Sequence, residues 1–259
     1  MRPRTLPLER SPLTSNPSRH ATRPLSEPRR RLGLVASALA LGLILSAAAH
    51  AEADQETLAA SSPEAVAAPA PTATATPTEV VEEFHAALLE MMKGSAEMSF
   101  DERVEFLTPR MDEAFDLDFM SSKTVGRQWK QLSSEQQQAW RAKFAELTIS
   151  NYAGRFVDYG GEEFRTLGNE HAARDTIMVL TRVEVPGEED VDLNYRLRET
   201  RDGWRIIDIY LKGTVSELAL RRSEYSSTLK RDGFEKLANA IDQKIADLRE
   251  EEEKEERGG

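Results

Sequence analysis

The chain has 259 residues and no cysteine, with 34 Lys and Arg residues against 45 Asp and Glu residues. The lack of cysteine excludes disulfides, thiol catalysis, thiolate metal sites and a lipid anchor attached to a cysteine. Residues 1–51 hold 8 of the basic and 2 of the acidic residues, so the rest of the chain has 26 against 43 and a net charge of −17. Such a chain is repelled by nucleic acid and by anionic membrane surfaces, and we expect no nucleic-acid partner.

The first 51 residues have the features of a secretory signal peptide. Three arginines at positions 29–31 precede an apolar run from Leu32 to Ala49, and the run ends in the small-residue pattern Ala49-His50-Ala51. A positive cluster, an apolar stretch and a small-residue exit are typical of a cleavable signal peptide. The alternative is a transmembrane anchor, but the run is near the lower length limit for spanning a bilayer. We therefore predict a signal peptide over residues 1–51, cleavage after Ala51 and export to the periplasm.

Residues 52–75 consist mainly of Ala, Pro, Thr, Glu and Ser, with almost no large apolar side chain. Such a segment buries too little surface to offset the entropy lost on ordering, which predicts a disordered linker. The folded domain is predicted at residues 76–249. The charged residues 250–259 are predicted to form a tail that frays.

Three capping boxes mark the starts of predicted helices at Thr76, Ser99 and Ser133. In a capping box, the side chains of the first residue and of the residue three positions later bond each other's backbone N–H groups. Apolar residues recur at helical spacing behind Thr76. The second helix is predicted to end before Pro109, and the third is predicted to continue to about Phe156.

After Gly160 and Gly161 the apolar period changes from that of a helix to that of a strand. Apolar and polar residues alternate most clearly from Val191 to Arg198. The predicted strands are 164–167, 176–185, 191–198 and 204–211, and the predicted helices after them are 215–230 and 234–248. This order predicts one α+β domain, with helices at both ends and a curved antiparallel sheet that has one apolar and one polar face.

The sequence offers few residues for metal binding or catalysis. After residue 51 the only histidines are His85 and His171, which lack the spacing of a zinc motif. No nucleophile elbow, phosphate-binding loop or dinucleotide fingerprint is present. We therefore expect no metal and no cofactor.

Asp208 is the best single candidate for a catalytic acid. It lies between Ile207 and Ile209 in an apolar strand, where burial would raise its pKa. Strand alternation favours a different interpretation, in which Asp208 lies on the more polar face with Trp204 and Tyr210 and bonds a neighbouring arginine.

The apolar faces of the predicted helices and strands point to a common interior. Most such faces are ordinary core, but a curved sheet with helices across its mouth can also leave a cleft. Periodicity alone does not separate these two possibilities.

Several segments, in order along the chain, resemble the MlaC (toluene-tolerance) family. Phe115–Met120, followed by Gly126-Arg127-Gln128-Trp129, resembles the family's aromatic-Asp segment and its Leu-Gly-Arg motif, with Val125 where Leu is usual. The other matching segments are 132–136 with Ser134 in place of Pro, 204–209, 213–216 with Thr214 as an insertion, 222–225, and 233–237. The ordered set extends from about Val80 to Leu248 and is more specific than any one motif.

The resemblance implies a fold and a function. The sheet is expected to be like that of nuclear transport factors, and the sheet and helices are expected to enclose a hydrophobic cavity. The protein is expected to be a periplasmic phospholipid carrier rather than an enzyme. It would work between an outer-membrane lipoprotein complex and an inner-membrane ABC transporter with an MCE-type subunit. Two other functions stay open: an enzyme on the same type of sheet, and an exported chaperone or adaptor.

Period-2 alternation predicts the strand walls of the lipid cleft, and helical spacing with the family resemblance predicts the helix walls. The predicted strand residues are Val179, Val183, Leu193, Tyr195, Leu197, Ile207, Ile209 and Leu211. The predicted helix residues are Met120, Val125, Trp129, Phe144 and Leu147. Some of these side chains must be ordinary core.

Overall fold

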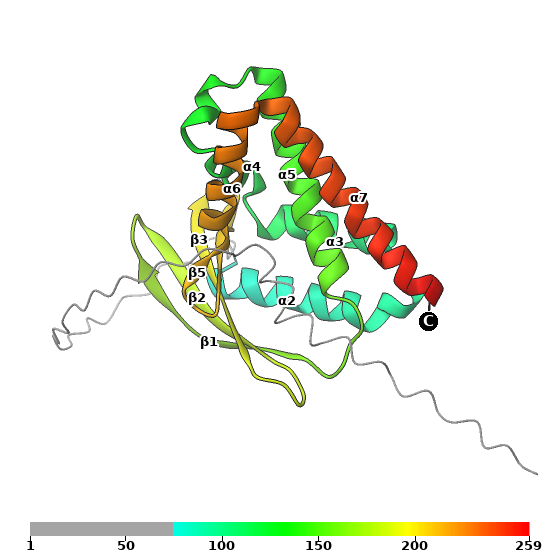
Figure 1. The fold of residues 1–259 in the computed structure, drawn as a ribbon. Helices are drawn as coiled ribbons and strands as arrows, with labels where there is room; N and C mark the ends of the chain where they lie inside the picture. Colours follow the sequence, from blue (N-terminus) through cyan, green and yellow to red (C-terminus); the bar gives the residue numbers. More distant parts are fainter. Residues whose placement is uncertain (1–74, 259) are drawn as a thin grey trace, which may run out of the picture. The chain divides into compact units, whose positions relative to one another are not determined.

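The computed structural model describes residues 75–258. The predicted signal peptide, and the predicted linker except Ala75, lie outside the described residues. The elements are α2 (Pro77–Gly94), the 3-10 helix η1 (Ser95–Glu97), α3 (Phe100–Ala114), α4 (Leu117–Thr124), the 3-10 helix η2 (Gly126–Gln131), α5 (Ser134–Arg155), β1 (Glu163–Ala172), β2 (Thr176–Glu184), β3 (Val191–Thr200), β4 (Gly203–Leu211), β5 (Val215–Ser216), α6 (Glu217–Asp232) and α7 (Phe234–Gly258) (Figure 1).

The five strands form one antiparallel sheet in the order β1-β2-β3-β4-β5, so each strand pairs with its neighbours in sequence. Helix α2 packs on β1, β2 and β4, while α6 packs on β4. Helix α5 packs against α3, α4 and α7 (Figure 1). The predicted α+β class and antiparallel sheet are confirmed. Within residues 75–258, no helix has both the length and the apolar character needed to cross a bilayer.

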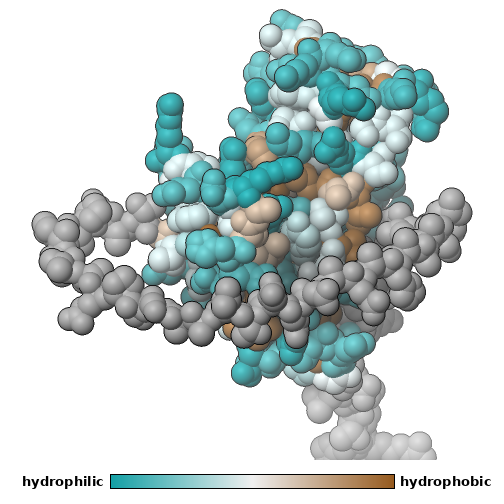
Figure 2. Space-filling model, turned by 90° about the vertical axis from the view of Figure 1, so that its left-hand side faces the viewer, coloured by the Kyte–Doolittle hydropathy of each residue, from teal (hydrophilic) through white to brown (hydrophobic). Residues whose placement is uncertain are grey.

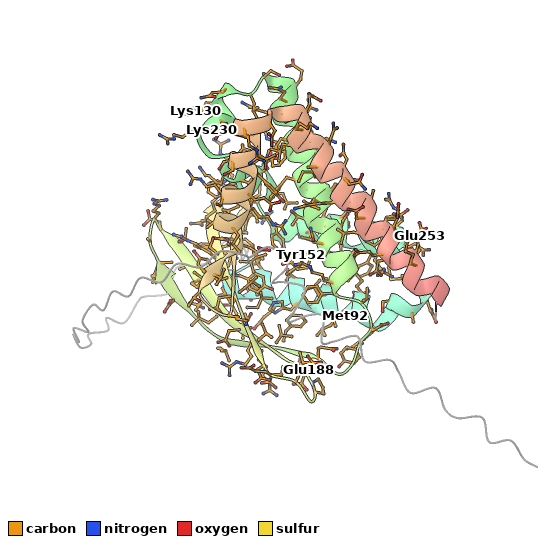
Figure 3. All side chains as sticks on the ribbon, viewed as in Figure 1. Met92, Lys130, Tyr152, Glu188, Lys230 and Glu253 are labelled. Atoms are coloured by element: carbon orange, nitrogen blue, oxygen red, sulfur yellow. The ribbon has the colours of Figure 1, made fainter. Side chains whose placement is uncertain are left out.

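The buried residues form one hydrophobic cluster that joins the helices to the inner face of the sheet. Figure 3 shows Met92 and Tyr152 among side chains in the interior, whereas Glu188, Lys130 and Lys230 lie at the periphery. On the face seen in Figure 2, hydrophilic residues dominate and hydrophobic ones gather near the centre. The sheet therefore buries one face in this cluster, as the alternation along β3 predicts.

The three predicted helix starts are confirmed, because Thr76, Ser99 and Ser133 each form both bonds of a capping box. At the first of them, Thr76 N donates to Glu79 Oε2 at 2.7 Å, and Glu79 N donates to Thr76 Oγ1 at 3.2 Å. Each box satisfies two N–H groups that the helix cannot satisfy itself. The starts are therefore set by local chemistry.

The prediction that the second helix ends before Pro109 is wrong, because α3 continues through this residue to Ala114. A proline inside a helix removes one backbone hydrogen bond. Leu107 before it and Met111 after it are both 0 % exposed. Burial of these side chains in one core offsets the lost bond.

Strand β1 is longer than the predicted 164–167, since it extends from Glu163 to Ala172. Its pairing with β2 passes from Thr166 to Gly168 and leaves Leu167 as an additional residue. Leu167 is 54 % exposed, and Gly168 has a positive φ of 145°. Such a bulge interrupts the alternation of side chains, which is why the pattern in the sequence ends too early.

A second irregularity lies between β3 and β4. Leu197 pairs with Ile206, whereas Arg196 pairs with Asp208, so Ile207 is the additional residue. Ile206, which simple alternation leaves on the opposite face, is 0 % exposed and belongs to the main core cluster.

Helix α7 continues through the segment that the sequence predicts to fray, and it ends at Gly258. Glu252 in this segment forms an ion pair with Arg103 of α3 at 2.5 Å. The Arg103 guanidinium also donates to the carbonyls of Ala153 at 3.0 Å and Met98 at 2.8 Å. Because Arg103 is 3 % exposed, this charge is one of the few that are buried in the fold. The end of α7 is therefore fastened to α3 and to the end of α5.

We expect Arg103→Met to lower the free energy of unfolding by about 3 kcal/mol, because it leaves the carboxylate of Glu252 without its buried partner. Arg249→Met is the matched control, since Arg249 pairs with Asp101 between the same two helices but at an exposed position. The control should cost less than about 1 kcal/mol. Urea unfolding of both variants measures the difference, and equal losses would contradict the assignment.

Candidate lipid-binding cavity

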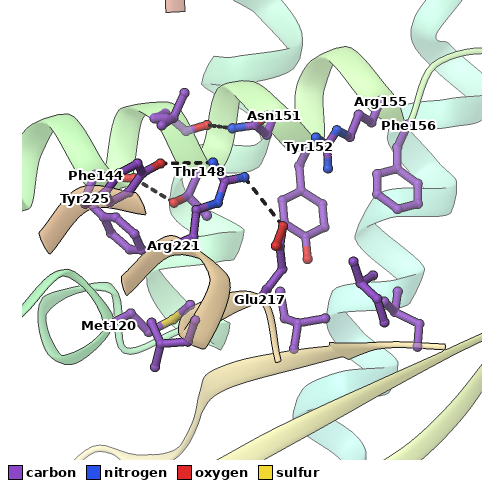
Figure 4. A pocket seen from close by; sticks show the side chains of 15 residues that line it. Met120, Phe144, Thr148, Asn151, Tyr152, Arg155, Phe156, Glu217, Arg221 and Tyr225 are labelled. Carbon is purple, nitrogen blue, oxygen red and sulfur yellow. Dashed lines mark hydrogen bonds and ion pairs between the residues drawn. The ribbon is translucent and has the colours of Figure 1, made fainter. Parts of the chain in front are cut away.

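A cavity of about 80 Å³ lies between α5, α6 and strands β3 and β4 (Figure 4). Its apolar walls are Met120, Phe144, Leu147, Phe156, Leu193, Ile209, Leu211 and Leu218. Phe144, Leu147 and Leu193 are at most 4 % exposed, so the floor is deep in the fold. Helices α5 and α6 share few backbone contacts, and the cavity occupies the space between their side chains.

Six of the predicted wall residues line this cavity: Met120, Phe144, Leu147, Leu193, Ile209 and Leu211. Their contact with a lipid stays a prediction. Val125, Val179, Val183, Tyr195 and Leu197 are instead at most 3 % exposed and belong to the packed core. Trp129 is half-buried in η2 and lies under the guanidinium of Arg141, while Ile207 is the additional residue of the bulge in β4. The difference follows from which helices cover each part of the sheet. Helix α2 packs on β1, β2 and β4, while the cavity lies where Leu193 of β3 and Ile209 and Leu211 of β4 face α5 and α6.

Tyr195 shows how a predicted wall residue becomes core. Its hydroxyl lies 3.0 Å from Nε2 of His85, which projects from α2. The His85 ring also stacks on Phe164, with 4.3 Å between ring centroids. Burial lowers the pKa of His85 to about 3, so the imidazole stays neutral in the folded protein near neutral pH.

This neutral histidine predicts a pH dependence of stability. Below pH 6.5 the unfolded chain binds a proton at His85 that the folded protein does not bind, so the free energy of unfolding falls by about 1.4 kcal/mol per pH unit until the folded pKa is reached. In His85→Phe this contribution is absent. Between pH 7.5 and pH 5, the free energy of unfolding of the wild type should therefore fall by about 2 kcal/mol more than that of the variant. Urea unfolding at both pH values measures the gap, and a constant gap would refute a buried neutral His85.

Polar groups form the rim of the cavity on the α6 side. Arg221 forms an ion pair with Glu217 at 3.5 Å and donates from its Nη1 atom to the Tyr225 hydroxyl at 2.9 Å. The side chains of Arg221 and Glu217 are 23 % and 19 % exposed, so this is where the cavity meets solvent. Arg155, the last residue of α5, and Tyr152 complete the rim (Figure 4).

The polar rim is not among the features predicted from the sequence. The spacing of Glu217, Arg221 and Tyr225 at four-residue steps places them on one face of a helix, and this signal was available in the sequence. The contribution of Arg155 was not, because α5 and α6 lie far apart in the chain and only the fold brings their ends together.

Asp208 is buried, at 6 % exposed, and does not bond an arginine as the sequence analysis favoured. Its carboxylate accepts hydrogen bonds from Ser216 Oγ at 2.6 Å, Leu218 N at 3.0 Å and Ile209 N at 2.9 Å. Burial raises its pKa, and these three bonds act in the opposite direction. Asp208 therefore fastens the start of α6 to β4 and does not present its carboxylate at the cavity wall. Among residues 75–258, no cluster of three or more His, Asp or Glu side chains could hold a metal ion.

The family model of the MlaC protein matches residues 82–243. The chain belongs to the MlaC family. The fold is also similar to that of a phospholipid-binding protein from Ralstonia solanacearum, solved in complex with a phospholipid. The two chains are 24 % identical with a TM-score of 0.60, and the match covers 67 % of this chain and 99 % of that one. A comparison with curated proteins gives no match. At this identity the solved structure shows that the two proteins share a fold.

Proposed function

We propose that this MlaC protein carries phospholipid through the periplasm, with the acyl chains in the cavity between α5, α6 and the sheet. The observation that carries the proposal is an apolar cavity with a charged rim in a member of the MlaC family. The Ralstonia solanacearum protein of the same fold was solved with a phospholipid bound, which supports this ligand class. The predicted signal peptide supports export.

The energetics of lipid transfer favour such a cavity. A phospholipid has on the order of 30 tail methylenes, and hiding each from water is worth about 0.8 kcal/mol. A carrier must therefore cover nearly all of the tails, or the lipid stays in its bilayer. A cavity of about 80 Å³ is small beside the roughly 300–1,000 Å³ of typical ligand sites, so the walls must separate to admit two acyl chains.

Helix α6 is the wall best suited to such movement. Only Tyr225 and Leu229 of its residues are buried, whereas α5 buries six residues and packs against α3, α4 and α7. Fewer buried side chains mean a smaller cost of displacement. We therefore infer that lipid entry moves α6 away from α5 while the core around α2 stays intact.

The partners follow from the family. Delivery between an outer-membrane lipoprotein complex and the MCE-type subunit of an inner-membrane ABC transporter is the role proposed for this chain. Its strong negative charge suits transient docking on basic surfaces of these proteins and keeps it from anionic membranes. The enzyme alternative loses its candidate acid, because Asp208 is committed to the start of α6.

Protein purified from the periplasmic fraction should yield phospholipid on organic extraction, detected by mass spectrometry at close to one lipid per protein. The tails supply enough buried apolar surface for the complex to persist through purification. Bound peptide would support the chaperone or adaptor alternative, and a small polar molecule would support an enzyme. Either result without phospholipid would overturn the carrier assignment.

A charge at the cavity wall should expel the lipid while the domain stays folded. We expect Leu211→Asp to reduce co-purified lipid by about tenfold or more, because an acyl chain cannot solvate a carboxylate. Val215→Asp is the matched control, since Val215 pairs with Leu211 across β4 and β5 but is 39 % exposed. Circular dichroism checks the fold of both variants, and Leu211→Asn replaces the first variant if the charge unfolds it. A folded Leu211 variant with full lipid content would exclude this wall.

A further inference from the structure

The charged groups at the rim of the cavity have a net positive charge. The rim contains two arginines, Arg155 and Arg221, and one carboxylate, Glu217. Arg221 is the arginine that pairs with Glu217. Among the described side chains of residues 75–254, Arg155 has no ion-pair partner and its guanidinium has no hydrogen-bond partner. The rim therefore keeps one positive charge in excess, in a chain whose part after residue 51 has a net charge of −17.

Arg155 is not a freely solvated surface residue. It is half-buried beside Tyr152 and Phe156 and lines the cavity (Figure 4). Burial and the neighbouring charge of Arg221 both lower its pKa, but an arginine remains protonated in proteins. Its position in the last turn of α5 places it at the helix end that carries a partial negative charge, which favours a cation there. An anion bound at the rim would pair with this partly buried cation, and the pairing would stabilise both charges.

We propose that Arg155, together with Arg221, binds the phosphate group of the carried phospholipid. The inference rests on the proposed function and adds a polar anchor to it. The planar guanidinium presents parallel N–H donors that match two phosphate oxygens. With the phosphate at the rim, the acyl chains of the same molecule extend along the apolar walls toward Leu147 and Leu193. The site thus selects amphiphiles by a feature that all glycerophospholipids share.

The test compares two ligands with the same acyl chains, dioleoyl phosphatidylglycerol and dioleoylglycerol, offered to delipidated protein in micelles of one neutral detergent. Arg155→Gln should weaken binding of phosphatidylglycerol by about tenfold or more, the effect of losing a charge-assisted hydrogen bond. Binding of dioleoylglycerol should not change, because it has no phosphate. The control is Arg222→Gln, which removes the same charge from an exposed position on α6 and should affect neither ligand.

A second variant gives an effect of opposite sign. Glu217→Gln frees Arg221 and raises the positive charge of the rim, so phosphatidylglycerol should bind severalfold more tightly while dioleoylglycerol is unaffected. This result is informative even if Arg155→Gln fails to fold. Inorganic phosphate at millimolar concentration should not displace the lipid, since it lacks the tails.

Three results would overturn the inference. If Arg155→Gln weakens binding of both ligands equally, the residue has a structural role. If binding of both is unchanged, Arg155 does not contact the phosphate. Efficient displacement of the lipid by inorganic phosphate would indicate a site for free anions. If the wild type binds neither lipid, the proposed function itself fails, and that outcome is distinct from the three above.

Discussion

Burial of the inner face of the curved sheet is the constraint on which the rest of the structure depends. Helix α2 packs on β1, β2 and β4, and its His85 packs with Phe164 of β1 and Tyr195 of β3. Over the ends of β3 and β4 the covering elements are α5 and α6, and these two helices do not close on each other. The core and the cavity are thus parts of one apolar surface, and they differ only in how completely helices cover it.

The helices that form the cavity walls are anchored at points outside the cavity floor. Helix α5 is supported by α7 along its length, and the ion pair between Arg103 and Glu252 fastens the far end of α7 to α3. Helix α6 is held at its start by the carboxylate of Asp208. Neither attachment uses the residues that line the cavity floor. These anchors act independently of the apolar side chains at the cavity floor, Phe144, Leu147 and Leu193, which themselves belong to the main core cluster.

Local signals in the sequence identified most of the helices and strands, but they did not predict α4 or the two-residue strand β5, which lies within the predicted helix 215–230. The capping boxes at Thr76, Ser99 and Ser133 predict three helix starts, because both partners of each bond lie within four residues. Pro109 misled the prediction of α3, since burial on both sides of it outweighs the lost hydrogen bond. No pattern in the sequence marks the bulge at Ile207.

The candidate site was predicted only in its apolar half. Alternation found Leu193, Ile209 and Leu211, but it assigned Val179 and Tyr195 to the same wall because period 2 identifies a face and not what covers it. The rim combines Arg155 of α5 with Glu217 of α6, and all five strands lie between these two residues in the sequence. Only the folded structure brings these two residues to the same cavity, so local sequence patterns do not predict the rim.

The bulge at Leu167 affects whether the sheets of two copies of the protein can pair edge to edge. Within the described residues β1 is an edge strand, and an unpaired edge offers N–H and C=O groups on which a second sheet can grow. The additional residue bends this edge, and the charged side chains of Glu163, Arg165 and Glu170 stand along it. The opposite edge is β5, which has only two residues. The bent, charged edge at β1 and the short strand β5 both disfavour strand addition, which protects the folded domain against edge-to-edge pairing at these two strands.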